Sequence, residues 1–291
     1  MIKNRKFTII GGDLRNVELG NQLLADKNRV NIYGFNNANF ENMLPQIDDL
    51  KLAIDESDVI IGPIPCSIDD ETVNAPYHDE KIYINDMLKI LSKNQLLIAG
   101  RISNKIQHLA KVRNVYAIDL LDREEMAVLN AIPTAEGAVQ LAMEEMPITL
   151  HGSNVIVLGF GRIGKTLAKV LHGIGANVYV EARKYSDIAW IRSYGYKPVY
   201  IDDLSLYIDK ADVIFNTVPS IILNEDLLKL VNKNCLLIDL ASKPGGIDLN
   251  KAKDLGLKTF WALSLPGKVA PVTAAGFIKD TIYNILEELG V

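Results

Sequence analysis

The chain has 291 residues, of which 48% are hydrophobic and 23% charged, so it can bury a core in one large or two medium domains. Its formal net charge of −5 argues against non-specific nucleic-acid binding, which needs a basic surface. Two widely separated cysteines, Cys66 and Cys235, lack the spacing of metal ligands. The N-terminal apolar run is too short for a signal peptide, and no apolar stretch approaches about 18 residues, so we expect a soluble cytoplasmic protein without membrane contact.

The first half of the chain contains short aliphatic runs, each followed by turn residues and a helical pattern. These runs are apolar almost throughout, as expected for parallel strands buried on both faces. They are KFTIIGGD (6–13), VNIYGF (30–35), DVIIGPIP (58–65), QLLIAG (95–100) and NVYAID (114–119). With helices expected around 14–27 and 102–112, the pattern predicts a flavodoxin-like parallel α/β domain.

A second series of strands begins after the middle of the chain. Its members are NVIVLGF (154–160), NVYVEA (177–182), PVY (198–200), DVIFNTVP (212–219), CLLIDL (235–240) and KTFWAL (258–263). Six strands with helices between them make a complete Rossmann NAD(P)-binding domain. The fold class is therefore α/β, with two parallel-sheet domains.

The segment between the two series is rich in Ala, Glu and Met, and we expect a connecting helix over 134–146. Near the C-terminus Ile278, Ile282, Ile285 and Leu286 fall on one helical face, which predicts a helix that packs back on the first domain. Pro271 suits the first turn of that helix and Thr273 suits its cap. The expected organisation is an N-terminal substrate-side domain (1–130), a connecting helix (131–150), a Rossmann domain (151–271) and the C-terminal helix (272–291).

The most specific motif is VIVLGFGRIGKT, which follows a strand and opens a helix. In such a GxGxxG segment Gly159 allows the tight turn, Gly161 lets the backbone approach a pyrophosphate, and Gly164 lets the helix pack on the strand. Backbone N–H groups at the helix start then face the anion, aided by the helix dipole. The residues predicted to bind the dinucleotide here are Gly159, Phe160, Gly161, Arg162, Ile163 and Gly164.

The end of the second Rossmann strand separates NAD from NADP, because NAD enzymes place an acidic residue there for the ribose hydroxyls. With Ala182 in that position nothing repels a 2′-phosphate, and Arg183 and Lys184 can pair with it. Should Glu181 point into the site instead, NAD is favoured. NADP is the predicted cofactor, with NAD as the alternative.

Further candidates follow other predicted strands and turns. Thr217, Val218 and Pro219 are expected to form a wall of the cofactor site, while Lys243 is a candidate carboxylate ligand or proton donor. Lys268 lies in a Pro-Gly loop and is available to an anion. Thr134 and Glu136 are placed at the start of the connecting helix, where Glu136 is either a catalytic group or merely a favourable first-turn charge.

In the first domain IIGGDLR forms a strand, a glycine turn and a helix start, but it lacks the full GxGxxG pattern. We expect Gly11 and Gly12 to leave backbone donors exposed beside Arg15, which favours a carboxylate ligand. Ser103 and Asn104 follow the fourth strand and are further candidates for hydrogen bonds to a substrate. The sequence contains no GxSxG or HExxH motif and no cysteine–histidine array, so no metal is predicted.

These segments together resemble the A-type subunits of dipicolinate synthase, a family of spore-forming bacteria. The resemblance rests on IIGGDLR, AIPTAEGAVQLAM, HGSNVIVLGFGRIGKTLA, NTVPSIILN, DLASKPGGID and LPGKVAPVTAAG, which occur in the family's order over nearly the whole length. The GFGRIG and PTAEGA segments also resemble D-2-hydroxy-acid dehydrogenases. Those enzymes use a late histidine, however, and His172 is the last histidine here.

The resemblance implies a sporulation enzyme that oxidises dihydrodipicolinate, or its 4-hydroxytetrahydro precursor, to dipicolinate with NADP as hydride acceptor. It also implies a flavoprotein-like second subunit, the B-type component of the synthase, as partner, and we expect homo-oligomers as well. Lys243 and Glu136 are then candidates for the proton transfer. Two alternatives stay open: a 2-hydroxy-acid-type reductase, and a nucleotide-binding scaffold on which the flavoprotein-like component does the chemistry.

Overall fold

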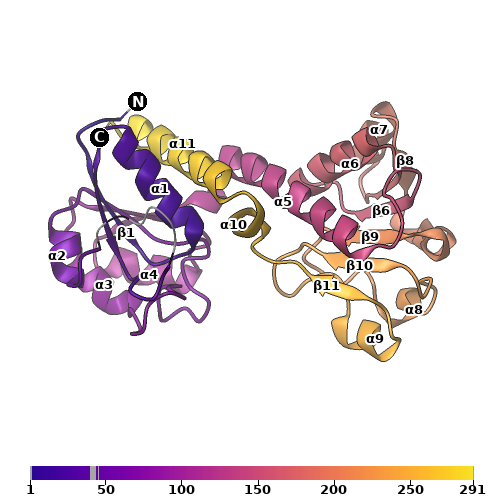
Figure 1. Cartoon of the computed structure of the whole chain (residues 1–291), viewed down its shortest axis with the longest axis horizontal. Helices are drawn as coiled ribbons and strands as arrows, with labels where there is room; N and C mark the ends of the chain where they lie inside the picture. Colours follow the sequence, from indigo (N-terminus) through magenta and orange to yellow (C-terminus); the bar gives the residue numbers. More distant parts are fainter. Residues whose placement is uncertain (1, 40–43, 45, 291) are drawn as a thin grey trace. The chain divides into compact units, whose positions relative to one another are not determined.

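The computed structural model describes residues 2–39, 44 and 46–290. The chain forms two compact units (Figure 1). The first unit comprises Met1–Leu129 and Ala270–Val291, and the second comprises Asn130–Val269. The chain thus leaves the first unit once and returns to it for its last helix.

The first unit contains one parallel sheet with the order β2-β1-β3-β4-β5. This is the flavodoxin-like order, and the predicted fold class of this half is confirmed. The strands are β1 (Lys6–Ile10), β2 (Arg29–Tyr33), β3 (Val59–Ile61), β4 (Leu96–Ala99) and β5 (Tyr116–Asp119).

Helices cover both faces of this sheet because successive strand residues point to opposite sides. Ile9 packs in a cluster with side chains of α1 and α11, whereas Ile10 packs in a cluster with α2, α3 and α4. The helices are α1 (Leu14–Ala25), α2 (Leu50–Asp55), α3 (Ile84–Ile90), α4 (Asn104–Val112) and α11 (Pro271–Leu289), with a 3₁₀ turn, η1 (Leu120–Asp122). Figure 1 shows α11 alongside α1, so the two ends of the chain share one layer.

The apolar face predicted for the C-terminal helix is buried: Ile278, Ile282 and Ile285 lie in the core of the first unit. Pro271 occupies the first turn of α11, as predicted. The capping role predicted for Thr273 is wrong. Ala270 is the N-cap residue without a side-chain cap bond, and Thr273 lies exposed in the first turn.

The second unit contains a parallel sheet with the order β11-β10-β9-β6-β7-β8, the doubly wound Rossmann arrangement that the sequence predicted. Its strands are β6 (Asn154–Leu158), β7 (Asn177–Glu181), β8 (Lys197–Val199), β9 (Val213–Asn216), β10 (Leu236–Asp239) and β11 (Thr259–Trp261). One face packs against α5, α6 and α7, and the other against η2, η3, α8 and α9. These elements and α10 are α5 (Glu124–Glu145), α6 (Arg162–Ile174), α7 (Tyr185–Ser193), η2 (Ile201–Leu206), η3 (Ile208–Lys210), α8 (Glu225–Leu228), α9 (Leu249–Asp254) and α10 (Leu265–Val269).

The connecting helix α5 begins at Glu124, ten residues before the predicted start at 134, and it runs through Pro133. A proline inside a helix removes one backbone hydrogen bond but does not by itself end the helix. Ala135, Ala138 and Ala142 bury one face of α5 against the second sheet, which holds the helix beyond the proline. None of the described helices combines the length and the apolar character that a membrane span needs.

Candidate functional site

Four strands of the second sheet end in register at one edge. Asp239 of β10 pairs with Asn216 of β9, which pairs with Leu158 of β6, which in turn pairs with Glu181 of β7. The glycine turn begins directly after Leu158, in the middle of this row. Ligands of open parallel sheets bind beyond such carboxyl ends, where the strand order reverses, and here the order reverses between β6 and β9.

The three glycines of the motif differ in what surrounds them and therefore in why a glycine suits each position. Gly159 has a φ of +93°, and a Cβ there would lie 2.6 Å from Val218 and 2.7 Å from Thr217. A Cβ on Gly164 would lie 2.1 Å from the carbonyl oxygen of Gly159, so only glycine lets α6 approach the turn. A Cβ on Gly161 would meet nothing within 4 Å, which leaves open space at the start of the helix.

That open space fits a pyrophosphate. Gly161 is the N-cap residue of the 13-residue helix α6, and no side chain caps the helix. The first N–H groups of α6 therefore keep their capacity to bind an anion. Among the neighbouring predicted residues, Phe160 is buried, Ile163 is half-buried and Arg162 is exposed, so the backbone rather than these side chains defines the cradle.

Glu181 lies at the end of β7 and is 1% exposed. Its Oε2 accepts a hydrogen bond of 3.1 Å from the Gly159 N–H, whereas its Oε1 is buried and has no hydrogen-bond partner among the residues that the structure describes. Burial raises the pKa of Glu181, while the Gly159 hydrogen bond and the charge of Arg183 act in the opposite direction. The carboxyl group thus stabilises the glycine turn through its hydrogen bond to Gly159.

The residues after β7 present no acidic group at the surface of the strand end. Ala182 is buried in the apolar core, and Arg183 and Lys184 are both exposed. Lys184 is also the N-cap residue of α7. This arrangement combines a small residue at the usual acidic position with two cations next to it.

The loop after β9 is fixed by its own side chains. The Thr217 hydroxyl donates a hydrogen bond of 2.8 Å to the carbonyl oxygen of Leu158, and the Val218 N–H donates one of 3.2 Å to Oδ1 of Asn216. Thr217 and Val218 are half-buried beside the glycine turn, and Pro219 is exposed. The predicted cofactor wall therefore lies next to the cradle.

The loop after β10 is held by Asp239, a residue that the sequence analysis did not single out. Its carboxylate is fully buried and accepts hydrogen bonds from Asn216 Nδ2 and from the N–H groups of Ala241, Gly246 and Ile247. Lys243 is exposed in the middle of this loop. The available signal was an Asp that ends an apolar strand, as in LLID.

Three other predicted residues of the second unit occupy different surroundings from those expected. Glu136 is exposed in the interior of α5, so its interpretation as a first-turn charge is wrong. Thr134 is 7% exposed in the same helix and donates a hydrogen bond of 2.7 Å to the carbonyl oxygen of Asn130. Lys268 is exposed in the last turn of α10.

The expectation that Gly11 and Gly12 leave backbone donors exposed is wrong. The Gly11 N–H donates to the carbonyl oxygen of Tyr33 and the Gly12 N–H to that of Asn74, at 2.9 and 3.0 Å. Asp13 and Asn16 then form a capping box at the start of α1. This helix start is satisfied by its own acidic cap, which opposes the binding of a further anion there.

Arg15 is buried with a side-chain exposure of 5% and forms an ion pair of 2.8 Å with Asp13. Its Nε also donates to Asp13, and its Nη2 donates to the carbonyl oxygen of Ile64. Arg15 is thus first a structural link between two loops.

The predicted substrate residues after β4 also have structural roles. Ser103 caps α4 by accepting a hydrogen bond of 3.3 Å from Ile106, and Asn104 is exposed at the first position of that helix. Asp119, at the end of β5, accepts hydrogen bonds from the N–H groups of Arg101, Ile102 and Leu121. It fixes its loop as Asp239 does in the second unit.

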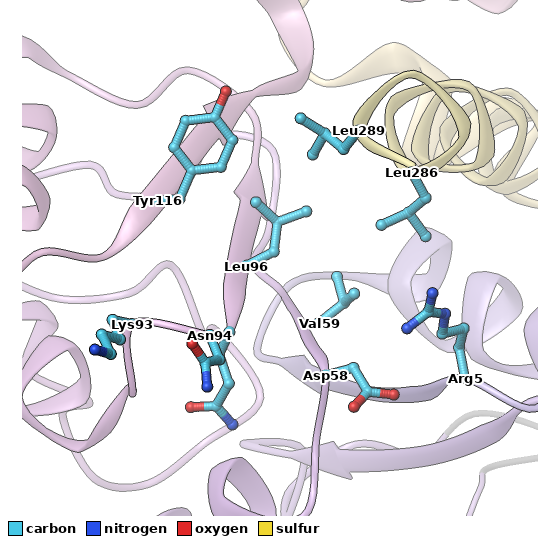
Figure 2. A pocket seen from close by; sticks show the side chains of 10 residues that line it. Arg5, Asp58, Val59, Lys93, Asn94, Leu96, Tyr116, Leu286 and Leu289 are labelled. Atoms are coloured by element: carbon cyan, nitrogen blue, oxygen red, sulfur yellow. The ribbon is translucent and has the colours of Figure 1, made fainter. Parts of the chain in front are cut away.

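A cavity of about 300 Å³ lies at the opposite edge of the first sheet, where β3, β4 and β5 begin (Figure 2). Arg5 and Asp58 lie on one side of it, and Tyr116 and Leu289 on the other. No predicted site residue lines this cavity. Among the described residues, no His, Cys, Asp and Glu side chains group as metal ligands, and burial raises the pKa of both Cys66 and Cys235 to about 12.

The second unit's strand order, its glycine turn and its open helix start define a dinucleotide-binding domain of an NAD(P)-dependent oxidoreductase. Residues 127–244 match the family model of the D-isomer specific 2-hydroxyacid dehydrogenase NAD binding domain. Residues 6–121 match the family model of the N-terminal domain of the A-type dipicolinate synthase subunits.

Relatives extend these matches over the whole chain. The chain is 32% identical to the A-type dipicolinate synthase subunit of Bacillus subtilis over 99% of its own length and 98% of the relative's. The crystal structure of the same subunit from Bacillus halodurans superposes with a TM-score of 0.87 at 30% identity, covering 98% of this chain and 99% of that one. The shikimate dehydrogenase (NADP(+)) of Pyrococcus abyssi is 30% identical over 136 residues, which are 42% of this chain and 51% of that protein. The chain belongs to the family of A-type dipicolinate synthase subunits.

Proposed function

We propose that this chain is the dehydrogenase subunit of a dipicolinate synthase and that it acts in sporulation. Its substrate would be dihydrodipicolinate or the 4-hydroxytetrahydro precursor, and its hydride acceptor NADP. The observation that carries this proposal is the open glycine cradle in a chain whose similarity to the A-type subunits covers both units.

Oxidation of dihydrodipicolinate removes a hydride and a proton from the ring, whereas the 4-hydroxytetrahydro precursor must also lose water. Aromatisation drives the oxidation. A bound dinucleotide supplies the hydride acceptor. The protein's own task is to bind two carboxylates, to exclude competing orientations and to accept one proton. Lys243 is the better candidate to accept the proton, because Asp239 fixes the loop that carries Lys243. Glu136, in contrast, lies in the middle of helix α5. Lys243 and Lys268 are the donors proposed for the carboxylates in the second unit. Arg15 is a separate proposed carboxylate ligand of the first unit.

NADP is the proposed cofactor because the strand end offers Ala182 with two exposed cations, and Glu181 is turned under the glycine turn. The name of the Pyrococcus relative, which includes NADP, agrees with this choice. The test is the ratio of the dissociation constants for NADP and NAD before and after Arg183→Ala. We expect NADP to weaken about tenfold while NAD stays unchanged. Arg192→Ala, an exposed arginine on α7, is the matched control. An unchanged ratio in Arg183→Ala rejects the 2′-phosphate assignment.

A flavoprotein-like second subunit is the proposed partner, by analogy with the relatives that are named as one component of the synthase. The activity test supplies the ring product of the lysine-pathway synthase with NADP and follows NADPH absorbance, with and without the flavoprotein-like component. NADPH formation coupled to dipicolinate is the expected result. Oxidation of simple 2-hydroxy acids by this chain alone, and none of the ring compound, would favour the hydroxy-acid reductase instead.

A further inference from the structure

Asn216 and Asp239 form a buried polar pair beneath the site edge of the second unit. Each is the last residue of its strand, both are 0% exposed, and Nδ2 of Asn216 donates a hydrogen bond of 2.7 Å to Oδ1 of Asp239. The second carboxylate oxygen accepts the N–H groups of Gly246 at 2.8 Å and Ile247 at 3.2 Å. Asn216 in turn binds both the N–H and the carbonyl of Val218.

The pair therefore joins the two loops that follow β9 and β10. The space around it is filled, because a Cβ on Gly245 would lie 2.8 Å from Oδ2 of Asp239 and one on Gly246 2.3 Å from Nδ2 of Asn216. Neither loop can move without breaking hydrogen bonds to a buried carboxylate or amide. A carboxylate in such surroundings is costly to keep unless something offsets its charge.

No described lysine, arginine or histidine forms an ion pair with Asp239. Its hydrogen bonds come from neutral amides, which satisfy the oxygen lone pairs but leave the negative charge in place. An Asp-to-Asn exchange would remove that charge at nearly the same volume. It would also leave one acceptor oxygen where two now accept N–H groups, so Asp239 both holds the loops and carries a charge beside the site edge.

The place of Asp239 in the sheet indicates what this charge does. Neighbouring strands are about 4.8 Å apart, so Asp239 lies about 10 Å from the end of β6, with Asn216 between them. A dinucleotide whose pyrophosphate lies on the glycine turn extends one half toward β7 and the other toward β9 and β10. Arg183 and Lys184 mark the adenosine side, so the nicotinamide belongs on the side of Asp239. The oxidised nicotinamide ring carries a positive charge and the reduced ring is neutral.

We infer that Asp239 determines specificity for the redox form of the cofactor: its buried charge favours the oxidised dinucleotide over the reduced one, and Asn216 is the positioning residue that holds the carboxylate. This inference rests on the proposed function, because it requires that the protein binds a nicotinamide dinucleotide. A dehydrogenase consumes the oxidised form and must release the reduced form. The same charge therefore favours binding of the form that is consumed and release of the form that is produced.

The test measures dissociation constants for NADP⁺ and NADPH by titration calorimetry, without turnover. A nicotinamide ring no farther from Asp239 than the end of β6, about 10 Å at an effective dielectric constant near 20, predicts that Asp239→Asn lowers the preference for NADP⁺ at least about tenfold. Asp119→Asn is the matched control, since this strand-end carboxylate fixes a loop of the first unit in the same way, and its ratio should stay at the wild-type value. Equal weakening of both forms in Asp239→Asn means a purely structural role and overturns the inference.

A second variant keeps the test decisive if Asp239→Asn does not fold. The double exchange Asn216→Asp with Asp239→Asn keeps one carboxylate and one amide in the pair and moves the charge one strand toward β6. We expect it to retain the preference for NADP⁺, and loss of the preference in a folded double variant overturns the inference. If the wild-type protein binds neither NADP⁺ nor NADPH, the proposed function itself fails. If it binds both and Asp239→Asn leaves the ratio of their dissociation constants unchanged, only this inference fails.

Discussion

Gly161 offers a clean test of the dinucleotide cradle, because the structure separates its role in binding from any role in folding. Gly161 has φ −78° and ψ −165°, an extended conformation that every residue adopts, and a Cβ there meets no atom within 4 Å. Gly161→Leu should therefore fold normally. Its side chain would fill the space at the start of α6 that a pyrophosphate needs.

The expected loss follows from the hydrogen bonds that the leucine blocks. Bonds from backbone N–H groups to a charged acceptor contribute about 1.5–3 kcal/mol each, so losing two weakens NADP by about 3–6 kcal/mol, or roughly 10²- to 10⁴-fold. The free energy of unfolding should change by less than about 1 kcal/mol. Calorimetric titration with NADP and thermal unfolding measure the two quantities on the same sample.

Gly173→Leu is the matched control, since Gly173 is exposed in the same helix and also has open space at its Cβ. It should leave NADP affinity at the wild-type value. NADP affinity within about threefold of wild type in Gly161→Leu would refute the placement of the pyrophosphate. Dipicolinate formation that survives loss of NADP binding would instead favour the scaffold alternative, in which the flavoprotein-like component does the chemistry.

Gly164→Ala should destabilise the protein by about 3 kcal/mol in urea unfolding, because its Cβ would lie 2.1 Å from the Gly159 carbonyl oxygen; a stable variant would show that α6 can move. Arg15→Ala should cost about 2 kcal/mol of stability, because Asp13 loses a partly buried ion pair; unchanged stability with a raised substrate KM would show that Arg15 acts as a ligand and not as a structural link. Glu181 has a raised pKa in the fold, so its contribution to stability is present below its ordinary value of 4.5 and is lost as the pH rises through the folded pKa. Glu181→Gln should flatten the fall in unfolding free energy across that window, and an unchanged pH profile contradicts the burial of a carboxyl group that resists ionisation.

The strands and the glycine turn were predictable because their causes are local. Parallel strands buried on both faces appear as continuous apolar runs, and every predicted strand is present. The turn requires glycine at Gly159 and Gly164 for reasons of local geometry. The start of α5 was missed for the opposite reason. The missed part lies before Pro133, where Met126 is buried among residues of the first unit that are distant in sequence.

The errors at Gly11 and Gly12 have a related origin. Their N–H groups are satisfied by the carbonyls of Tyr33 and Asn74, which lie far along the chain and carry no sequence signal. Asp239 was missed because its partner Asn216 is 23 residues away and its other donors are backbone groups. A glycine turn shows where the backbone is free to bend, but which of its donors remain free depends on loops that meet only in the folded chain.

Acidic residues lie on both sides of the glycine turn proposed to bind an anion, so their charges bear on how a cofactor binds there. Glu181 and Asp239 end strands in the same row as Leu158, where the turn begins. Glu181 reaches the Gly159 N–H, and burial raises its pKa, so its charge is the one that the fold disfavours. Asp239 accepts hydrogen bonds from a side-chain amide and from the backbone of its own loop. The row of strand ends thus disfavours a negative charge on the side proposed for the 2′-phosphate, and it places Asp239 on the side proposed for the positively charged ring. A cofactor that differs in sign between its two ends would be oriented by this asymmetry.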